Sequence, residues 1–579
     1  MSFPGSSPGE LYRQIIKGAW RNGESMRWLP ALILSLLWVM HAGAAIQIVE
    51  FCPDPYLHDD ADEFLVLSGN GSLDGITISD GKGGFRFPVG TKINGFLTVA
   101  RSGTAFEQSH GKYPDFEWLD FSQVVPNVIN GAPLRMANIN DTLMLYENGI
   151  LIQKVSWPED VKPREGQIHY LEKGVWDPRP LMIGQSRFTP AVFHNVTVTT
   201  FVSPDCSSDV FTYAVNRASD EVLVNVYEFS SPAIGELLID AKTRGVDVRV
   251  LVEGGPVGGI SPEEKALLFK MSEQEIPVLE MISLPGDPAP YRYDHAKYVV
   301  IDRQATLVTS ENFKYSGFPP PGMSSNRGWG VYLEDPALAD YFSTVYLWDS
   351  KGKSVAPYTG IMGNPEPLPE EKHTTEFGSG YFTGATVRPV IAPDTSNEIA
   401  DLINSAERSI EIEQAYITNE TPDSLNPYLS AAVNASRRGV HVRILLDSYW
   451  YNIEDEKDND EMVDLINQIG ESEHIPLEAR CADLQTNQIK QIHNKGVIVD
   501  DSRVLVSSIN WNSNSPNFNR EAGVIIDHEG VARYFLEVFE DDWNPSIRSP
   551  EIKTDYLKFV MVAIILVGLL IIYYRRQRI

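Results

Sequence analysis

The chain has 579 residues, of which 43% are hydrophobic and 22% are charged. These proportions are typical of a folded protein and exclude a chain that is mainly disordered. The formal net charge of −30 at pH 7 excludes a generally basic protein that coats nucleic acid through its overall charge, although a local basic pocket stays compatible with it. The three cysteines, Cys52, Cys206 and Cys481, leave room for one disulfide at most and match no zinc-binding spacing.

The first apolar run of the chain, residues 28–40, predicts export. It follows Arg27 and precedes small residues that end at Ala45, and this order is typical of a secretory signal peptide. The run is shorter than the roughly 20 residues that cross a bilayer as a helix. We therefore predict a cleaved signal peptide over residues 1–45, for which Met26 is the more conventional start.

A second apolar run, residues 556–574, contains one charged residue, Lys558. Its length and composition predict a transmembrane helix. Arginines follow in residues 575–579, which predicts a short cytoplasmic tail by the positive-inside rule. Together with the signal peptide, this pattern predicts a single-pass protein of the cell membrane whose folded part lies outside the cytoplasm.

Residues 46–202 have the sequence pattern of an all-β region. Short segments of alternating apolar and polar residues recur there, separated by clusters of Gly, Asn, Asp and Pro. This pattern predicts short strands joined by turns, and therefore a β-sandwich. No His, Cys or carboxylate cluster of the region has the spacing of a chemical site.

A repeat follows, because the segment RGVDVRVLVEG at Arg244–Gly254 matches RGVHVRILLDS at Arg438–Ser448. A helical stretch precedes each copy, and a strand precedes each helix, so each copy predicts a strand–helix–strand unit with a parallel pair. The sequence therefore predicts two α/β halves, residues 203–353 and 380–547. The segment 354–379 is rich in Pro, Gly and Glu and predicts a connector.

Each half contains the pattern H-x-K-x4-D, once as His295, Lys297 and Asp302 and once as His493, Lys495 and Asp500. Because side chains two apart on a strand point to the same face, the His and Lys of each pattern are able to meet one substrate. The aspartates have the opposite parity and precede a turn. There a carboxylate caps backbone N–H groups, and we expect a structural or supporting role for both.

Short polar segments follow the motifs on the return strands. They contain Ser310 and Asn312 in the first half and Ser508 and Asn510 in the second. Hydroxyl and amide side chains are neutral hydrogen-bond donors, suited to an anionic oxygen. We therefore expect these four residues to bind or support the binding of an anionic group.

The paired motifs, each followed by Ser-x-Asn, resemble those of the phospholipase D superfamily over about residues 205–546. The resemblance implies that both halves share one active site on a phosphodiester substrate, and that no metal or other cofactor is needed. One histidine would attack phosphorus and form a phosphohistidine, while the other would protonate the leaving oxygen. The residues implied to bind the phosphoryl oxygens are Lys297, Lys495, Asn312 and Asn510.

One asymmetry separates the halves. The second half contains Asn519-Arg520-Glu521, and the resemblance implies that Glu521 orients a histidine. The matching first-half position is Gly328, which has no carboxylate, so Glu311, Asp294 or Glu334 is expected to substitute. Family precedent favours His295 as the nucleophile and His493 as the acid, but the asymmetry leaves this assignment open.

The β region resembles a lamin-tail domain, an immunoglobulin-like sandwich, in the segments Asp62–Leu67, Phe87–Thr91 and Asp141–Tyr146. The resemblance implies a binding or positioning role, and a plain spacer is the alternative. The predicted fold class is thus α/β, with a pseudo-symmetric pair of phospholipase D-like halves. An all-β sandwich precedes the halves and a single transmembrane helix follows them.

These features predict a membrane-anchored, outward-facing phosphodiesterase, active as a single chain because one chain supplies both motifs. A membrane anchor would keep the site near lipid, which favours a phospholipid substrate. The alternatives are an extracellular metal-independent nuclease and an inactive surface scaffold or adhesion protein. The aromatic residues near the second motif have two interpretations, either stacking with bases or packing in the core; they are Tyr449, Trp450, Tyr451 and Trp511.

Overall fold

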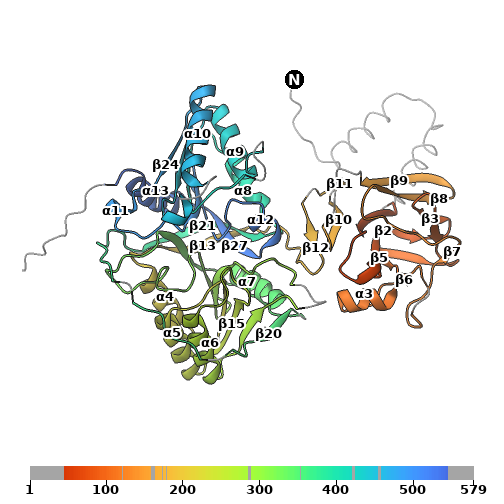
Figure 1. Ribbon diagram of the computed structural model, residues 1–579, viewed down its shortest axis with the longest axis horizontal. Helices are drawn as coiled ribbons and strands as arrows, with labels where there is room; N and C mark the ends of the chain where they lie inside the picture. The colour runs from red at the N-terminus through yellow and green to blue at the C-terminus, as the bar shows by residue number, and fades with distance from the viewer. Residues whose placement is uncertain are drawn as a thin grey trace, which may run out of the picture. The chain divides into compact units, whose positions relative to one another are not determined.

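The structure is a computed structural model with two compact units, residues 1–183 and 184–579. It describes residues 45–545 except 120–121, 158–163, 173, 178, 285–288, 353, 361, 369, 420–423 and 454–457. Figure 1 shows the chain coloured from one end to the other. Each unit is described by itself.

The first unit is a sandwich of two β-sheets with a shared apolar core. The first sheet runs in the order β11 (Val175–Trp176), β10 (Gln167–Glu172), β1 (Gln47–Cys52), β2 (Phe64–Ser72), β5 (Lys92–Ala100) and β6 (Phe116–Glu117), with β12 (Leu181–Met182) paired to β10. The second runs β7 (Ile129–Asn130), β4 (Gly84–Arg86), β3 (Ile76–Ser79), β8 (Asp141–Glu147) and β9 (Ile150–Trp157). Phe51 and Leu65 from one sheet pack with Leu145 and Trp157 from the other.

This unit confirms the predicted β-sandwich and adds short helical segments to it. The helix α3 (Gly103–His110) begins at Ser102, whose Oγ accepts the N–H of Ala105, and a 3-10 turn, η1, covers His58–Asp60. The resemblance to a lamin-tail domain stays a prediction.

The second unit is built on one 15-stranded sheet with a pseudo-symmetric strand order. One half runs β20 (Val355–Pro357), β16 (Val278–Met281), β15 (Asp247–Glu253), β14 (Glu221–Val226), β17 (Lys297–Ile301), β18 (Ala305–Thr309), β19 (Gly328–Glu334) and β13 (Phe193–Ser203). The other continues β21 (Gly380–Ala392), β27 (Glu521–Asp527), β26 (Arg503–Ser507), β25 (Lys495–Val499), β22 (Ser409–Gln414), β23 (His441–Leu446) and β24 (Leu477–Cys481). Apart from β20, the order of the first half is the mirror of the second, with β13 beside β21 at the centre.

The parallel pairs β14–β15 and β22–β23 confirm the strand–helix–strand units predicted from the repeat. The helices are α4 (Ser207–Asn216), α5 (Pro232–Thr243), α6 (Pro262–Glu273), α7 (Pro336–Asp349), α8 (Asn397–Asn404), α9 (Pro427–Arg437), α10 (Asn459–Glu473), α13 (Glu529–Trp543), the short α11 (Leu484–Asn487) and α12 (Ser515–Phe518), and the 3-10 turn η2 (Trp450–Asn452). In Figure 1, α5 and α6 lie at one end of this unit and α9 and α10 at the other.

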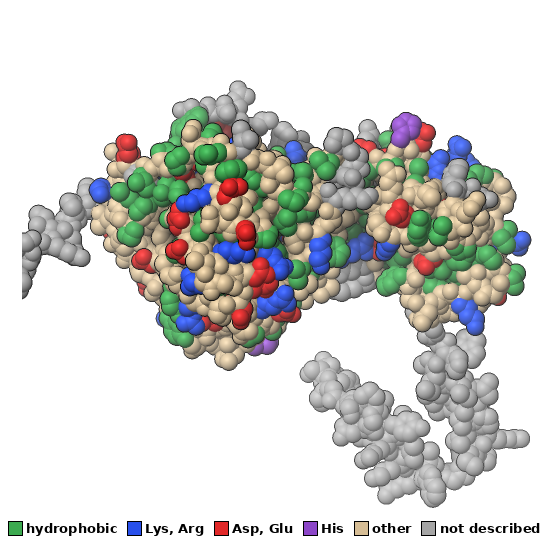
Figure 2. Space-filling view, turned by 90° about the horizontal axis from the view of Figure 1, so that it is seen from below, with side chains coloured by type: hydrophobic (Ala, Val, Ile, Leu, Met, Phe, Trp, Pro, Cys, Tyr) green, Lys and Arg blue, Asp and Glu red, His purple; other side chains and the backbone are tan. Residues whose placement is uncertain are grey.

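Local sequence explains where several of these helices begin. In α5, α6, α7 and α9 a capping Ser, Asp or Asn accepts a backbone N–H of the first turn, and proline occupies the next position. Proline suits this position because its missing N–H would have no partner within the helix anyway. Figure 2 shows one face of the unit, where Lys and Arg side chains lie among Asp and Glu side chains.

The boundary between the units differs from the predicted one. The strand expected to end the sandwich belongs instead to β13, which pairs with β19 and β21 in the second unit. Val196 and Val198 are buried in the core of that unit. Alternation of apolar residues predicts a strand but does not identify the sheet that receives it. The predicted connector also packs on the first half, where Glu366 accepts a hydrogen bond from Ser230 at 2.6 Å.

The membrane-spanning part of the predicted fold class is corrected. Among the residues that the structure describes, no helix is long and apolar enough to cross a bilayer. The predicted helix at 556–574, the tail at 575–579 and residues 1–44 of the signal peptide lie outside the described residues. The three cysteines are all free.

Two buried arginines tie the halves of the second unit together. In the first half, Arg327 Nη1 donates to Asp205 Oδ2 at 2.7 Å. Its Nε donates to Asp542 Oδ2 of the second half, also at 2.7 Å. All three side chains are fully buried, so the guanidinium neutralises one carboxylate from each half.

Arg520 makes the reciprocal connection. Its Nη1 donates to Asp394 of its own half at 3.2 Å, and its Nη2 donates to Asp349 of the first half at 2.9 Å. Burial opposes the charged form, yet the neighbouring Asp349 and Tyr291 groups hold the pKa of Arg520 above its usual range. Because an unpaired buried charge is costly, the arrangement stabilises each half only when the other is in place.

We predict that Arg327→Met lowers the free energy of unfolding of the second unit by about 3–5 kcal/mol, because it removes the guanidinium that neutralises the buried carboxylates of Asp205 and Asp542. Denaturant unfolding followed by tryptophan fluorescence measures the change. Arg437→Ala is the matched control, since Arg437 pairs with Glu473 on the surface and its loss leaves the unfolding curve unchanged. An Arg327→Met variant as stable as the wild type would contradict this role.

Candidate active site

The two histidine–lysine pairs lie where matching strands begin. Lys297 is the first residue of β17 and Lys495 the first of β25, and the histidines precede them by two positions. The lysine side chains are fully buried, whereas His295 and His493 keep 12% and 18% of their side-chain surface exposed. Each Nζ donates to the carbonyl oxygen of its own histidine, at 2.7 Å and 2.6 Å. Both lysines are thus held beside a partly open histidine ring.

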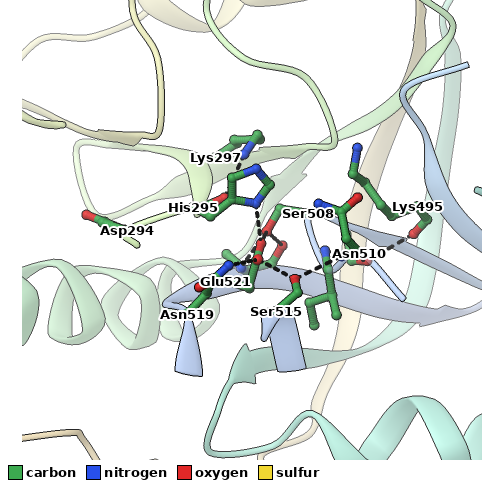
Figure 3. A network of polar contacts seen from close by, with 12 residues as sticks. Asp294, His295, Lys297, Lys495, Ser508, Asn510, Ser515, Asn519 and Glu521 are labelled. Carbon is green, nitrogen blue, oxygen red and sulfur yellow. Dashed lines mark hydrogen bonds and ion pairs between the residues drawn. The ribbon is translucent and has the colours of Figure 1, made fainter. Parts of the chain in front are cut away.

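His295 is held by a glutamate of the opposite half. Its Nδ1 lies 2.8 Å from Oε2 of Glu521, the first residue of β27. The carboxylate also accepts hydrogen bonds from Ser508 Oγ at 2.6 Å, from Asn519 Nδ2 at 3.0 Å and from Ser515 Oγ. Figure 3 shows the ring above this carboxylate, with Asn510 and Lys495 on one side. Burial raises the pKa of Glu521, but the adjacent His295 and these donors bring it below its ordinary value.

His493 has the reciprocal arrangement. Its Nδ1 lies 3.2 Å from Oε1 of Glu311, which follows β18 in the first half. Of the three residues expected to replace a carboxylate at position 328, Glu311 is therefore the one that reaches a histidine. Glu334 ends β19 and pairs with Arg217 at 3.6 Å. Asp294 is buried, and burial raises its pKa well above its ordinary value.

The electrostatics of the site favour an anionic ligand. Burial lowers the pKa of His295 to about 4, and the pKa of Lys297 to about 8. Burial and then the charge of Lys297 lower the pKa of Lys495 to about 7. Burial, followed by the charge of Lys495, also lowers the pKa of His493. The repulsion between these two crowded ammonium groups is relieved by a bound anion.

The predicted asparagines line the same region. Asn312 and Asn510 are 8% and 9% exposed, and their Oδ1 atoms have no hydrogen-bond partner among the described residues. Asn312 Nδ2 donates to Glu228 at 2.7 Å. The serines have other partners. Ser310 Oγ accepts the N–H of Trp329 at 3.1 Å, and Ser508 Oγ donates to Glu521, which holds His295. Of the two expected roles, binding the anion or supporting its binding, the contact of Ser508 fits the supporting one.

The motif aspartates follow the ends of β17 and β25 that lie away from the histidines. Asp302 accepts the N–H groups of Ser219, Asp220 and Glu221, each at 2.8 Å. Asp500 accepts the N–H groups of residues 407–409 at 2.7–3.2 Å. These hydrogen bonds anchor the starts of β14 and β22, so the aspartates have the structural role expected from their parity.

Sequence reasoning missed a second pair of carboxylates that support the histidines. Glu253 Oε2 accepts the N–H of Asp294, and Asp447 Oδ1 accepts the N–H of Ile492, both at 2.6 Å. Asp294 and Ile492 directly precede the two histidines. Glu253 and Asp447 occupy the same position in the two copies of the repeat, and this shared acidic position was the signal that would have revealed them.

The loops that follow β15 and β23 form two rims beside the histidines. The ring of Tyr227 lies edge to face against the ring of His295, with the ring centres 4.6 Å apart. The Tyr227 hydroxyl accepts the N–H of Val257, which is 76% exposed. On the other rim, Trp450 and Tyr451 are 56% and 48% exposed. Each rim therefore presents apolar surface to solvent beside the site.

The remaining aromatic residues near the second motif divide between rim and core. Tyr449 packs against Tyr451 with ring centres 5.0 Å apart, whereas Trp511 is fully buried and packs in the core. Within the described residues, no group of three or more His, Cys, Asp or Glu has an arrangement that would hold a metal ion.

Comparison with known proteins identifies the class. Residues 212–349 and 399–543 match the family model described as cardiolipin synthase, PLD-like domain. These segments carry the two His–Lys pairs and the two glutamates that meet at the site. The chain therefore belongs to the phospholipase D superfamily, and the double match agrees with the pseudo-symmetric sheet.

A curated relative and several solved structures resemble parts of the chain. The mitochondrial cardiolipin hydrolase of Canis lupus familiaris is 29% identical over 119 residues, which are 20% of this chain and 41% of that protein. Nuc from Salmonella typhimurium, a phospholipase D family member, is 22% identical and covers 29% of this chain and 99% of its own, with a TM-score of 0.24. Phosphatidylserine synthase of Haemophilus influenzae Rd KW20 is 14% identical and covers 60% and 85%, with a TM-score of 0.43.

We predict that sulfate binds at the lysine pair and that its affinity falls as pH rises from about 6 to about 9. Sulfate keeps its charge over this range, whereas Lys495 and Lys297 lose theirs around pH 7 and 8. Calorimetry measures the affinity, and Lys495→Met weakens it at the low end by about 10-fold or more. The exposed Lys490 provides the control substitution Lys490→Met. A pH-independent affinity would show that the lysines do not hold the anion.

Proposed function

We propose that this protein is a phosphodiesterase that acts through a phosphohistidine, with a phospholipid as its substrate. The observation that carries the proposal is the meeting of two His–Lys pairs in one chain. The Nδ1 of each histidine is hydrogen-bonded to a glutamate of the opposite half. Because one chain supplies all of these groups, a single chain is expected to be active.

The first step needs a neutral nucleophile and a proton donor. Burial lowers the pKa of His295 to about 4, which leaves its Nε2 free to attack phosphorus at neutral pH. A P–N bond forms, the P–O bond to the leaving alcohol breaks, and the protonated ring of His493, held at Nδ1 by Glu311, gives its Nε2 proton to that oxygen. Lys297 and Lys495 neutralise the charge on the phosphoryl oxygens.

The second step restores the enzyme. His493, now neutral, takes a proton from water or from a second alcohol as that oxygen attacks phosphorus. The P–N bond breaks, and its electron pair returns to His295. Water gives hydrolysis and an alcohol gives transfer of the phosphatidyl group, and both outcomes use the same side chains.

Two observations support a phospholipid. The curated relative that matches the chain is named a cardiolipin hydrolase. In addition, Val257 on one rim and Trp450 and Tyr451 on the other are exposed beside the histidines, and Trp and Tyr are favoured at the boundary between lipid and water. We also propose export, which rests on the signal-peptide pattern in residues 1–45.

A nuclease is the second candidate, favoured by the Tyr449–Tyr451 cluster, whose exposed Trp450 and Tyr451 rings are able to stack on bases. Against it, the face in Figure 2 mixes acidic and basic side chains, whereas nucleic-acid backbones favour a positively charged surface. The net charge of −30 also slows the approach of a polyanion.

We predict that the protein releases head groups from mixed phospholipid vesicles in EDTA and leaves single-stranded DNA in the same tube intact. His493→Ala lowers this rate by about 10²–10⁴-fold, because it removes the proton donor. Chromatography of head groups and gel analysis of DNA follow both products.

The double variant Trp450→Ala/Tyr451→Ala separates chemistry from surface contact. It lowers turnover on vesicles but preserves turnover of the soluble diester bis(p-nitrophenyl) phosphate. Shortened DNA without head-group release would replace the lipid proposal with the nuclease. If no tested diester is turned over, the phosphodiesterase proposal fails and the scaffold alternative gains support.

A further inference from the structure

The two halves place their carboxylates at different positions in matched segments. In the second half the segments read Ser508-Ile509-Asn510 and Asn519-Arg520-Glu521. In the first they read Ser310-Glu311-Asn312 and Asn326-Arg327-Gly328. Glu521 of the second half thus corresponds to Gly328 of the first, and Ile509 of the second half corresponds to Glu311 of the first.

The space beside Gly328 explains why it has no side chain. A Cβ built at this position would lie 2.3 Å from Oε1, 2.5 Å from Cγ and 2.7 Å from Cδ of Glu311. The φ of Gly328 is not positive, so the backbone does not require glycine. The side chain of Glu311 already fills the volume that a side chain at position 328 would take.

Matching asparagines donate to the carboxylate in both halves. Asn519 Nδ2 donates to Glu521 at 3.0 Å, and the matching Asn326 Nδ2 donates to Glu311 at 3.2 Å. Each glutamate then meets Nδ1 of the histidine from the opposite half. A carboxylate reached from a different backbone position therefore enters the same polar environment.

We propose that Glu311 positions His493 and that its carboxylate replaces one that would otherwise extend from residue 328. Its role rests on the proposed function, because it acts through a histidine that gives and takes the proton. By accepting the Nδ1–H of His493, the carboxylate keeps Nε2 directed at the site and stabilises the protonated ring.

The two carboxylates are not equivalent, and the difference suits different roles. Glu521 shares its charge among three donors besides His295, namely Ser508, Ser515 and Asn519. The hydrogen bonds described for Glu311 come from His493 and Asn326. Less of the charge on Glu311 is dispersed, so it supports a protonated ring better, as a proton donor requires. This asymmetry assigns His493 as the acid and His295 as the nucleophile.

The experiment transfers the carboxylate from position 311 to position 328, which matches Glu521 of the second half. Glu311→Ile copies the residue of the second half and lowers kcat by about 10²-fold or more, with a small effect on KM. Adding Gly328→Glu in the same chain places a carboxylate in the vacated volume and restores kcat to within about 10-fold of the wild type. Glu311→Gln keeps the shape and loses the charge, so it remains impaired. Glu334→Gln is the matched control and leaves kcat unchanged.

A spectroscopic measurement separates this proposal from the phosphodiesterase proposal. NMR of the full chain with ¹⁵N-labelled histidine reports the tautomer and titration of His493 without any substrate. Glu311→Ile changes the tautomer and lowers the pH at which the ring titrates, and the double variant reverses both changes. These results hold even if no substrate is found. The proposal is overturned if the folded double variant resembles Glu311→Ile, or if Glu311→Gln resembles the wild type, in this spectrum.

Discussion

The buried exchange of arginines between the two halves is the constraint on which the site depends. Arg327 and Arg520 each neutralise carboxylates of both halves inside a fully buried environment. Their backbones also reach the motifs. The carbonyl of Arg520 accepts the N–H of His295 at 2.8 Å, and that of Arg327 accepts the N–H of His493 at 2.9 Å. Because a buried guanidinium is costly without its carboxylates, each arginine is held in one position. Its backbone then positions the histidine of the other half.

The two glutamates at the histidines repeat this exchange. Glu521 and Glu311 cross between the halves to the histidine rings, while Glu253 and Asp447 hold the segments before those rings from within each half. The lysines then lie close enough for the charge of one to lower the pKa of the other. Preorganisation of this kind places positive charge where a phosphoryl group gains negative charge, before any substrate arrives.

Much of the site was predictable because its chemistry repeats in the chain. His295 and His493, with their lysines, recur at matched spacing, and strand parity separated them from Asp302 and Asp500. The sequence left three candidates for the carboxylate that is missing at Gly328. Only the three-dimensional contacts, namely the hydrogen bond to His493 and the packing against Gly328, identify Glu311. The sheet that receives β13 and the burial of Arg327 also depend on contacts between distant segments. Local patterns predict an element's type but not its partner.

The most direct test of the central claim is to trap the covalent intermediate. The His493→Ala variant, supplied with bis(p-nitrophenyl) phosphate, needs no acid for the first step because the leaving phenolate is stable, yet it lacks the base for the second. Mass spectrometry after an alkaline quench is then predicted to find an acid-labile phosphoryl adduct on His295. Turnover without an adduct, or an adduct on any other residue, would contradict a shared site in which His295 attacks and His493 transfers the proton.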